Sequence, residues 1–109
     1  MENNSFTIQP SHMPITAAIV DDEPQFRELL SSLLGKRFPE LTVLGVAGSV
    51  AEGSTLVREK RPDLLFLDVE MGDMNGFDLL KRIAPFEPLV VFVTAHQGYA
   101  VRAIKFNAL

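Results

Sequence analysis

Four side chains that could do chemistry together stand directly after short apolar runs of this sequence. They are Asp21 and Asp22 after residues 17–20, Asp68 after residues 64–67, and Thr94 after residues 89–93. A short apolar run without polar alternation is typical of a parallel strand buried on both faces. The functional groups of a parallel sheet gather at the carboxyl ends of its strands, beside the point where strand order reverses. We therefore expect the four side chains to share one cleft.

Three carboxylates in one cleft need a positive partner, because two unit charges ~4 Å apart repel by ~4 kcal/mol at an effective dielectric of ~20. Mg²⁺ suits this role, since it prefers oxygen ligands and binds through one or two carboxylates together with a phosphate. With the cation in place, an aspartate can attack a phosphoryl group and form an acyl phosphate. The hydroxyl of Thr94 could donate to a phosphoryl oxygen. Such a phosphorylation can act as a switch, because the new dianion pulls a nearby hydroxyl and loop toward itself.

Strands and helices are predicted to alternate along the chain. The predicted strands cover residues 17–20, 41–47, 64–67 and 89–93. The predicted helices run from Pro24 to a stop at Phe38-Pro39, from a cap at Ser49 to about Lys60, from Phe77 to Ile83, and from Tyr99 to about Asn107. Strands that alternate with helices at this spacing imply an α/β fold, in which a parallel sheet is covered on both faces by right-handed crossovers.

Length and composition limit what the chain can be. Its 109 residues have room for one domain, and 47% hydrophobic with 22% charged residues is the balance of a soluble globular protein. A formal net charge of −4 argues against direct binding of nucleic acid. The sequence has no cysteine, no run of ~20 apolar residues and no signal sequence, which favours a cytoplasmic protein. We expect residues 1–14 to be a flexible leader and residues 15–109 to be the domain.

The order and spacing of three motifs closely resemble the receiver domains of two-component response regulators. The motifs are Asp21-Asp22-Glu23, Leu65-Phe66-Leu67-Asp68 with Gly76 eight residues on, and Val93-Thr94-Ala95. The stretches 92–96, 99–103 and 107–109 are similar to the LytTR-type (LytR/AlgR-like) subfamily, whose output is a DNA-binding domain. The resemblance covers Thr16 to Leu109. It implies a flavodoxin-like, doubly wound parallel sheet with strand order 2-1-3-4-5.

The resemblance also implies roles for individual residues. Asp68 would be the phosphoacceptor and one of the groups around Mg²⁺. Asp22 would bind the Mg²⁺ directly and Asp21 through water, with the backbone carbonyl of Glu70 as a further ligand. Thr94 matches the switch hydroxyl that contacts the phosphoryl group.

The same resemblance implies the partners. Ala95 matches the small residue that leaves access to the acceptor, and the phosphoryl group would come from a phosphohistidine on a sensor histidine kinase. DNA would be contacted only through a C-terminal output domain. We therefore expect a signalling domain with self-phosphorylation and autodephosphorylation at most, rather than an enzyme.

Two features depart from the family's pattern. The proline usual four residues after the acceptor is Gly72 here, which should loosen that loop without abolishing phosphorylation. The sequence stops at Leu109, before the family's fifth strand with its switch aromatic, its active-site lysine and its last helix. Lys105 does not replace that lysine, because it falls in the fourth predicted helix. The fourth strand would then be an open edge and the sheet face beside the first helix would be uncovered, so we expect a homodimer or a domain-exchanged dimer.

Other interpretations stay open from the sequence. The most serious is a degenerate receiver that acts only as a dimerisation or binding module. A nucleotide hydrolase is disfavoured because the Gly-x-x-x-x-Gly-Lys-Ser/Thr loop is missing. A phosphatase is disfavoured because the acid pair it usually needs is separated by one residue, whereas Asp21 and Asp22 are adjacent. Taken alone, Asp21-Asp22-Glu23 could be an acidic helix start, and the apolar side chains of residues 99–106 could form a core face or a partner surface.

Overall fold

The structure, a computed structural model, describes residues 14–93 and 104–107. Its helices are α1 (Pro24–Arg37), α2 (Val50–Lys60) and α3 (Gly76–Ile83). Its strands are β2 (Ile15–Val20), β3 (Leu41–Ala47), β4 (Leu64–Asp68), β5 (Glu70–Met71), β6 (Met74–Asn75), β7 (Leu89–Val93) and β8 (Ile104–Asn107). These bounds agree with the predicted strands and with the first three predicted helices to within two residues. The two-residue strands β5 and β6 were not predicted.

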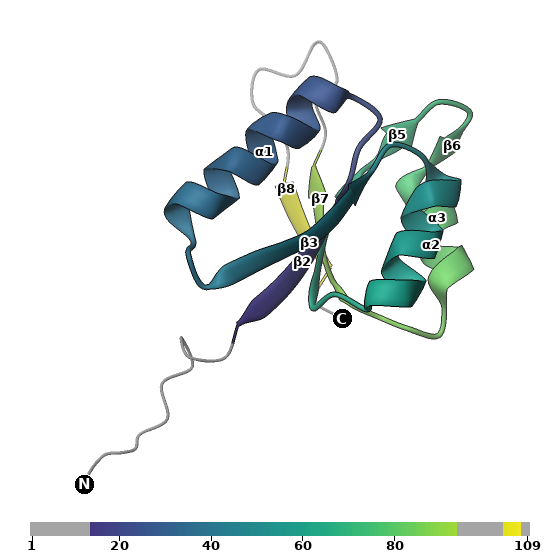
Figure 1. The fold of residues 1–109 in the computed structure, drawn as a ribbon. Coiled ribbons are helices and arrows are strands. Elements are labelled where there is room, and N and C mark those ends of the chain that lie inside the picture. Colours follow the sequence, from purple (N-terminus) through teal and green to yellow (C-terminus); the bar gives the residue numbers. More distant parts are fainter. Residues whose placement is uncertain (1–13, 94–103, 108–109) are drawn as a thin grey trace, which may run out of the picture.

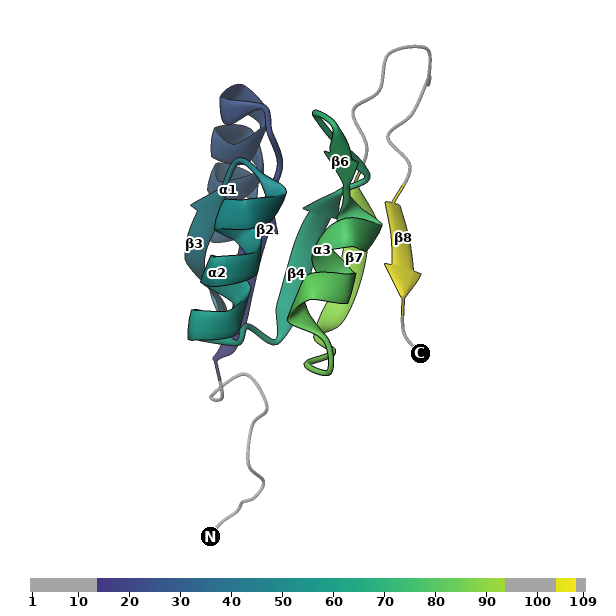
Figure 2. The same ribbon diagram turned by 90° about the vertical axis from the view of Figure 1, so that its right-hand side faces the viewer.

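The main sheet has the strand order β3-β2-β4-β7-β8. The pairs β2–β3, β2–β4 and β4–β7 are parallel, so the chain order reverses at β2 and the strands β2 and β4 lie side by side. Among the described helices, α1 lies on one face of the sheet and α2 with α3 on the other, as Figure 1 and, turned by 90°, Figure 2 show. This is the predicted flavodoxin-like α/β arrangement, and its switch point falls where Asp21 and Asp68 end neighbouring strands.

Local sequence signals explain where the helices start and stop. Pro24 occupies the first turn of α1, where its missing N–H costs nothing. The Ser49 side chain caps α2 by accepting a hydrogen bond from the Glu52 N–H at 3.1 Å. Asn75 and Asp78 form a reciprocal capping box at the start of α3, with bonds of 3.0 and 2.8 Å.

The hydrophobic core lies mainly between the sheet and the α2–α3 layer. Its fully buried members from the strands are Ala18, Val20, Leu65 and Leu67, and its fully buried members from the helices are Val57 and Leu79. Strands β2, β4 and β7 are apolar at consecutive positions, as expected for central strands of a sheet that has helices on both faces. No helix among the described residues is both long and apolar enough to cross a membrane.

The C-terminal end of the described chain corrects one prediction. Residues 104–107 form strand β8, antiparallel to β7, and not the end of a helix. The prediction of a helix from Tyr99 to about Asn107 is therefore wrong for residues 104–107, and residues 99–103 lie outside the described residues. The physical reason is that the edge of β7 offers unpaired N–H and C=O groups, which a short segment can satisfy only as a strand. The expectation that the fourth strand stays an open edge is wrong for the same reason.

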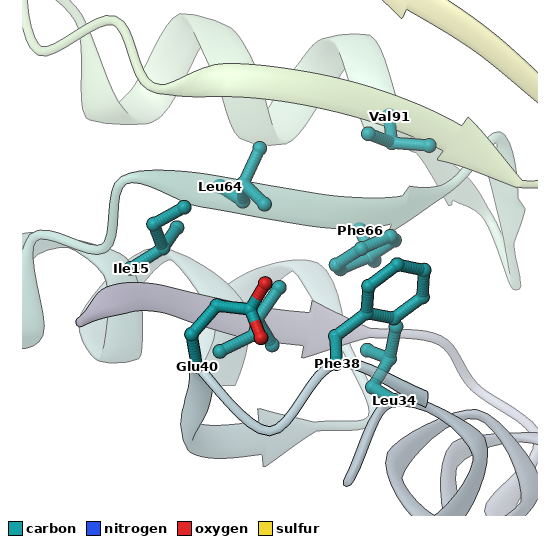
Figure 3. Close-up of a pocket in the computed structure, with 8 residues that line it drawn as sticks. Ile15, Leu34, Phe38, Glu40, Leu64, Phe66 and Val91 are labelled. Carbon is teal, nitrogen blue, oxygen red and sulfur yellow. The ribbon is translucent and has the colours of Figure 1, made fainter. Parts of the chain in front are cut away.

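A second expectation concerns the sheet face beside the first helix, which the described residues cover only in part. An apolar pocket of about 490 Å³ opens on the α1 side of the sheet. Its lining side chains come from the sheet, from the end of α1 and from the turn between α1 and β3 (Figure 3). They are Ile15, Leu34, Phe38, Glu40, Leu41, Leu64, Phe66 and Val91. Phe38 is 50% exposed and Ile15 is 41% exposed, so the described residues leave large apolar side chains open to solvent here.

Candidate functional site

The three predicted carboxylates meet at one edge of the sheet. One carboxylate oxygen from each of Asp21, Asp22 and Asp68 lies within 4.8 Å of the others. Asp21 directly follows β2 and Asp68 is the last residue of β4, and these two strands are neighbours in the sheet. Asp21 and Asp68 are buried, whereas Asp22 is exposed at the mouth of the cluster. The parallel pairing of two apolar strands thus brings together acids that are far apart in sequence.

The main chain around Asp21 is fixed from several directions. Its N–H donates to the Ala47 carbonyl at 3.0 Å, which extends the pairing of β2 with β3 by one residue. Its carboxylate Oδ1 accepts a hydrogen bond from the Glu23 N–H at 2.8 Å. Its carbonyl oxygen accepts a hydrogen bond from Arg27 Nη1 at 2.7 Å. The backbone from which Asp21 and Asp22 extend is therefore held in place at the end of β2.

Asp68 lies in an environment that resists its negative charge. Its side chain is only 7% exposed, and burial, followed by the negative charge of Asp21, raises its pKa to about 7 from the usual 3.8. A backbone hydrogen bond from Glu70, at 3.4 Å to Oδ1, acts in the opposite direction and lowers the pKa, while the charge of Asp22 raises it further. The negative charges of Asp21 and Asp22 thus lie beside the buried carboxyl group of Asp68.

This donor set fits a hard divalent cation. The ligand atoms offered are all carboxylate oxygens, the type that Mg²⁺ prefers, and they lie close enough together to share one ion. A cation between them would offset the repulsion that raises the pKa of Asp68. An acidic helix start alone does not explain the cluster, because Asp68 comes from another strand and not from the beginning of α1.

The loop after Asp68 is a tight hairpin made of β5 and β6. Glu70 pairs with Asn75 and Met71 with Met74, so residues 72 and 73 form the turn. Gly72 has a φ of 64°, a left-handed conformation that glycine adopts without penalty and that proline, locked near −65°, cannot adopt. The departure from the family's usual proline therefore has a local reason, and Gly72 closes a paired turn where a looser loop was predicted.

Gly76 has a steric reason for its place eight residues after Asp68. A Cβ added to Gly76 would lie 2.7 Å from the Asp68 carbonyl oxygen and 3.0 Å from Leu67 Cγ. The Gly76 N–H also donates to the Val69 carbonyl at 2.8 Å. The start of α3 can therefore approach β4 closely only with glycine at this position.

The other predicted site residues stand as follows. Glu70 lies beside Asp68 through the bond of its N–H, and its carbonyl stays a predicted ligand. Thr94 and Ala95, the predicted switch hydroxyl and access residue, lie outside the described residues, although β7 ends at Val93 directly before them. The strand β7 pairs with β4 so that Val93 is opposite Asp68.

Sequence reasoning missed Arg27 and Gly48. A cation in the first turn of a helix is unfavourable toward the helix macrodipole, and Arg27 occupies that turn of α1, which contains no acidic residue. A basic residue at such a position signals a partner outside the helix, and the structure shows that this partner is the Asp21 carbonyl. Gly48 could not have been found from its sequence position alone, because its role depends on where the Arg27 side chain lies.

Comparison with known proteins identifies the family. Residues 17–109 match the family model described as response regulator receiver domain. The sensory transduction protein LytT of Enterococcus faecalis is 44% identical over 92 residues, which cover 83% of this chain and 38% of that protein. The transcriptional regulatory protein BtsR of Escherichia coli K12 is 36% identical over 95 residues, which cover 86% of this chain and 39% of that protein. The chain therefore belongs to the response-regulator receiver family.

Solved structures agree with this assignment. The response regulator domain of CheB from Thermotoga maritima matches with a TM-score of 0.68 and 30% identity, over 80% of this chain and 66% of that one. A two-component response regulator of the LuxR family from an Aurantimonas species matches with a TM-score of 0.69 and 28% identity, over 78% of this chain and 61% of that one. Receiver domains are signalling domains that histidine kinases phosphorylate, and they generally use Mg²⁺ held by acidic residues.

The match to LytT proteins, of Enterococcus faecalis and also of Bacillus subtilis at 38% identity, agrees with the LytTR-type resemblance seen in the sequence. The chain spans about two fifths of the length of these curated relatives. What the remaining three fifths of such proteins do is therefore a separate question from what this domain does.

Proposed function

We propose that this receiver domain accepts a phosphoryl group on Asp68, in a Mg²⁺-dependent reaction, from a phosphohistidine on a sensor histidine kinase. The observation that carries the proposal is the meeting of three carboxylate oxygens, from two neighbouring strand ends, within 4.8 Å. A buried acceptor with two further acids beside it is the donor set that a divalent cation needs when it also holds a phosphate. Family membership supports the same chemistry.

Each residue has a distinct part in the proposed reaction. Asp22, exposed at the mouth of the cluster, binds the cation directly, while the buried Asp21 acts through water and the Glu70 carbonyl completes the protein ligands. When bound, Mg²⁺ neutralises charge on the transferring phosphoryl group and on the carboxylates around it. A carboxylate oxygen of Asp68 then attacks phosphorus as the bond from phosphorus to the donor's histidine nitrogen breaks.

The ionisation of Asp68 connects the cation to the attack. A pKa of about 7 leaves a large share of the acceptor protonated near neutral pH, and a protonated carboxyl is a poor nucleophile. A nearby cation favours the charged form and lowers the pKa. A cation held by Asp21 and Asp22 would therefore also favour the ionised form of Asp68, the form that attacks phosphorus.

The consequence of phosphorylation is proposed to be a change of protein contacts. Thr94 is the proposed switch hydroxyl and Ala95 the proposed access residue, directly after β7, the strand that pairs with the acceptor strand. Within a longer protein this change would control a transcriptional regulator that contacts DNA through an output domain. A homodimer or a domain-exchanged dimer is the proposed assembly, since the pocket beside α1 leaves apolar surface open.

The proposal is tested with a small acyl phosphate donor, acetyl phosphate, and intact-mass analysis. We expect one phosphoryl addition in the presence of Mg²⁺ and none in EDTA, and we expect Asp68→Asn to abolish the addition. Asp73→Asn is the matched control, because Asp73 is an exposed acid in the same loop and should leave the addition unchanged. An unmodified wild-type chain that is folded and supplied with Mg²⁺ would contradict the proposal and favour a receiver that acts only as a binding or dimerisation module.

A further inference from the structure

The side chain of Arg27 connects two loops at the edge of the acidic cluster. Its Nη1 donates to the Asp21 carbonyl oxygen at 2.7 Å. The same Nη1 lies 2.8 Å from the point where a Cβ on Gly48 would be placed. Gly48 stands between the end of β3 and the Ser49 cap of α2. The guanidinium group therefore lies between the loop after β2 and the loop after β3, and a side chain at position 48 would force it to shift.

The loop that supports Arg27 from the other side is itself fixed. The Gly48 N–H donates to Glu52 Oε1 at 3.1 Å, and the Glu52 N–H donates to Ser49 Oγ at 3.1 Å. These two bonds tie the turn to the first turn of α2. The backbone of residues 48–49, next to the guanidinium group, is thus held in place. It therefore limits movement of the Arg27 side chain toward Gly48.

Hydrogen bonds hold the main chain of Asp21 at both its N–H and its carbonyl group, and Arg27 makes the second of them. The Asp21 N–H is held by Ala47 of β3, and the Asp21 carbonyl oxygen is held by Arg27 of α1. The peptide that this carbonyl belongs to joins Asp21 to Asp22. Its orientation therefore sets the direction in which both carboxylates leave the chain.

We propose that Arg27 is a positioning residue for the cation site, acting through the Asp21–Asp22 peptide and seated in the space left by Gly48. The inference rests on the proposed function, since it concerns how tightly the same carboxylates hold Mg²⁺. Arg27 does not need to touch the cation. Groups that orient metal ligands commonly change metal affinity by ~10–100-fold when they are removed, and a single backbone bond belongs at the lower end of that range.

The first experiment measures Mg²⁺ affinity of the full 109-residue chain by isothermal titration calorimetry. We expect Arg27→Met to weaken Mg²⁺ binding by about tenfold. Arg58→Met is the matched control, because Arg58 also donates a hydrogen bond to a main-chain carbonyl, that of Arg82, at 3.0 Å. Arg82 lies in the last turn of α3, at the end of the helix away from the acidic cluster. We expect the control to bind Mg²⁺ within about twofold of the wild type.

The second experiment uses Gly48 to separate positioning from a general loss of stability. Gly48→Ala keeps Arg27 but places a methyl group 2.8 Å from Nη1, so it should weaken Mg²⁺ binding by about threefold or more. In the Arg27→Met background the same substitution should have no further effect on Mg²⁺ affinity, because the group that it displaces is gone. Unfolding measured in EDTA provides the readout of stability alone, against which both affinity losses are compared. Should Arg27→Met fail to fold, Gly48→Ala and Arg27→Lys carry the same comparison.

The outcomes distinguish the inference from the proposed function. A wild-type chain that binds no Mg²⁺ at millimolar concentration overturns the proposed cation site and this inference with it. A wild-type chain that binds Mg²⁺, with Arg27→Met and Gly48→Ala binding equally well, overturns the inference alone. Additive losses in the double variant, or an equal loss in Arg58→Met, would also overturn it, because the effect would then be one of general stability.

Discussion

Burial makes the negative charge of Asp68 costly in the folded state. Its pKa is raised to about 7, above the 3.8 of an unburied aspartate, so the folded state binds a proton more tightly than the unfolded state. The contribution of this group to stability is therefore fully present below about pH 4 and is lost as the pH rises toward about 7. Without a bound cation, the buried carboxylate of Asp68 therefore lowers the stability of the folded protein at neutral pH.

Asparagine at position 68 should remove that cost, because it has a similar shape and carries no charge. In EDTA at about pH 8, we expect Asp68→Asn to raise the free energy of unfolding by about 1–2 kcal/mol. This is less than the ~4 kcal/mol that the full rise in pKa would represent, because solvent reduces the cost of burying the charge and of placing it beside Asp21. At about pH 4 the two proteins should be equally stable. Urea unfolding at both pH values measures the difference, and a gain that is the same at both would contradict the raised pKa.

At the scale of single residues, the sequence predicted the three acids but not Arg27, which holds the backbone of Asp21, or Gly48 beside it. Asp21, Asp22 and Asp68 could be placed because each follows an apolar run that ends at the same edge of a parallel sheet. The partner of Arg27 could not be named, because it is a main-chain carbonyl and carbonyls carry no sequence signal. The role of Gly48 depends in turn on Arg27.

Among the elements, the β5–β6 hairpin is the one that most directly shapes the acceptor loop. Its turn needs the positive φ of Gly72, and its first strand contains Glu70, whose N–H bonds Asp68. Restoring the family's usual residue by Gly72→Pro should therefore lower the free energy of unfolding by more than about 1 kcal/mol, since the native φ is incompatible with proline.

A second glycine provides the control for that measurement. Gly35 lies in α1 with no atom within 4 Å of an added Cβ, so Gly35→Ala should stabilise the protein by about 0.5–1 kcal/mol. Urea or thermal unfolding compares the two variants with the wild type. If Gly72→Pro proved as stable as the wild type, the left-handed turn would not be a requirement of this loop.

The elements that were predicted well are those whose signals are local. Apolar runs identified β2, β3, β4 and β7, Pro24 identified the start of α1, and the cap Ser49 identified the start of α2. Strand β8 was missed because a short amphipathic stretch is compatible with either a helix or a strand, and the open edge of β7 decided between them. The hairpin β5–β6 was missed because pairs of two residues leave no periodic pattern.

At the scale of the whole molecule, the two faces of the sheet are covered unequally by the described residues. Helices α2 and α3 close one face over the core, whereas α1 leaves the apolar pocket of about 490 Å³ beside it. The acidic cluster lies at the carboxyl edge of the same sheet, so the cluster and the partly covered face are built on the same strands. This arrangement followed from the predicted strand order, but the size of the pocket and the antiparallel β8 did not.

The central claim, that the fold gathers three acids so that Asp68 alone takes up phosphate, is tested most directly by locating the modified residue. The chain is treated with acetyl phosphate and Mg²⁺, the acyl phosphate is reduced with borohydride to homoserine, and tandem mass spectrometry identifies the altered position. We predict homoserine at position 68 only, and only when Mg²⁺ is present. Homoserine at position 21 or 22, or an equal yield at position 68 in EDTA, would contradict the account.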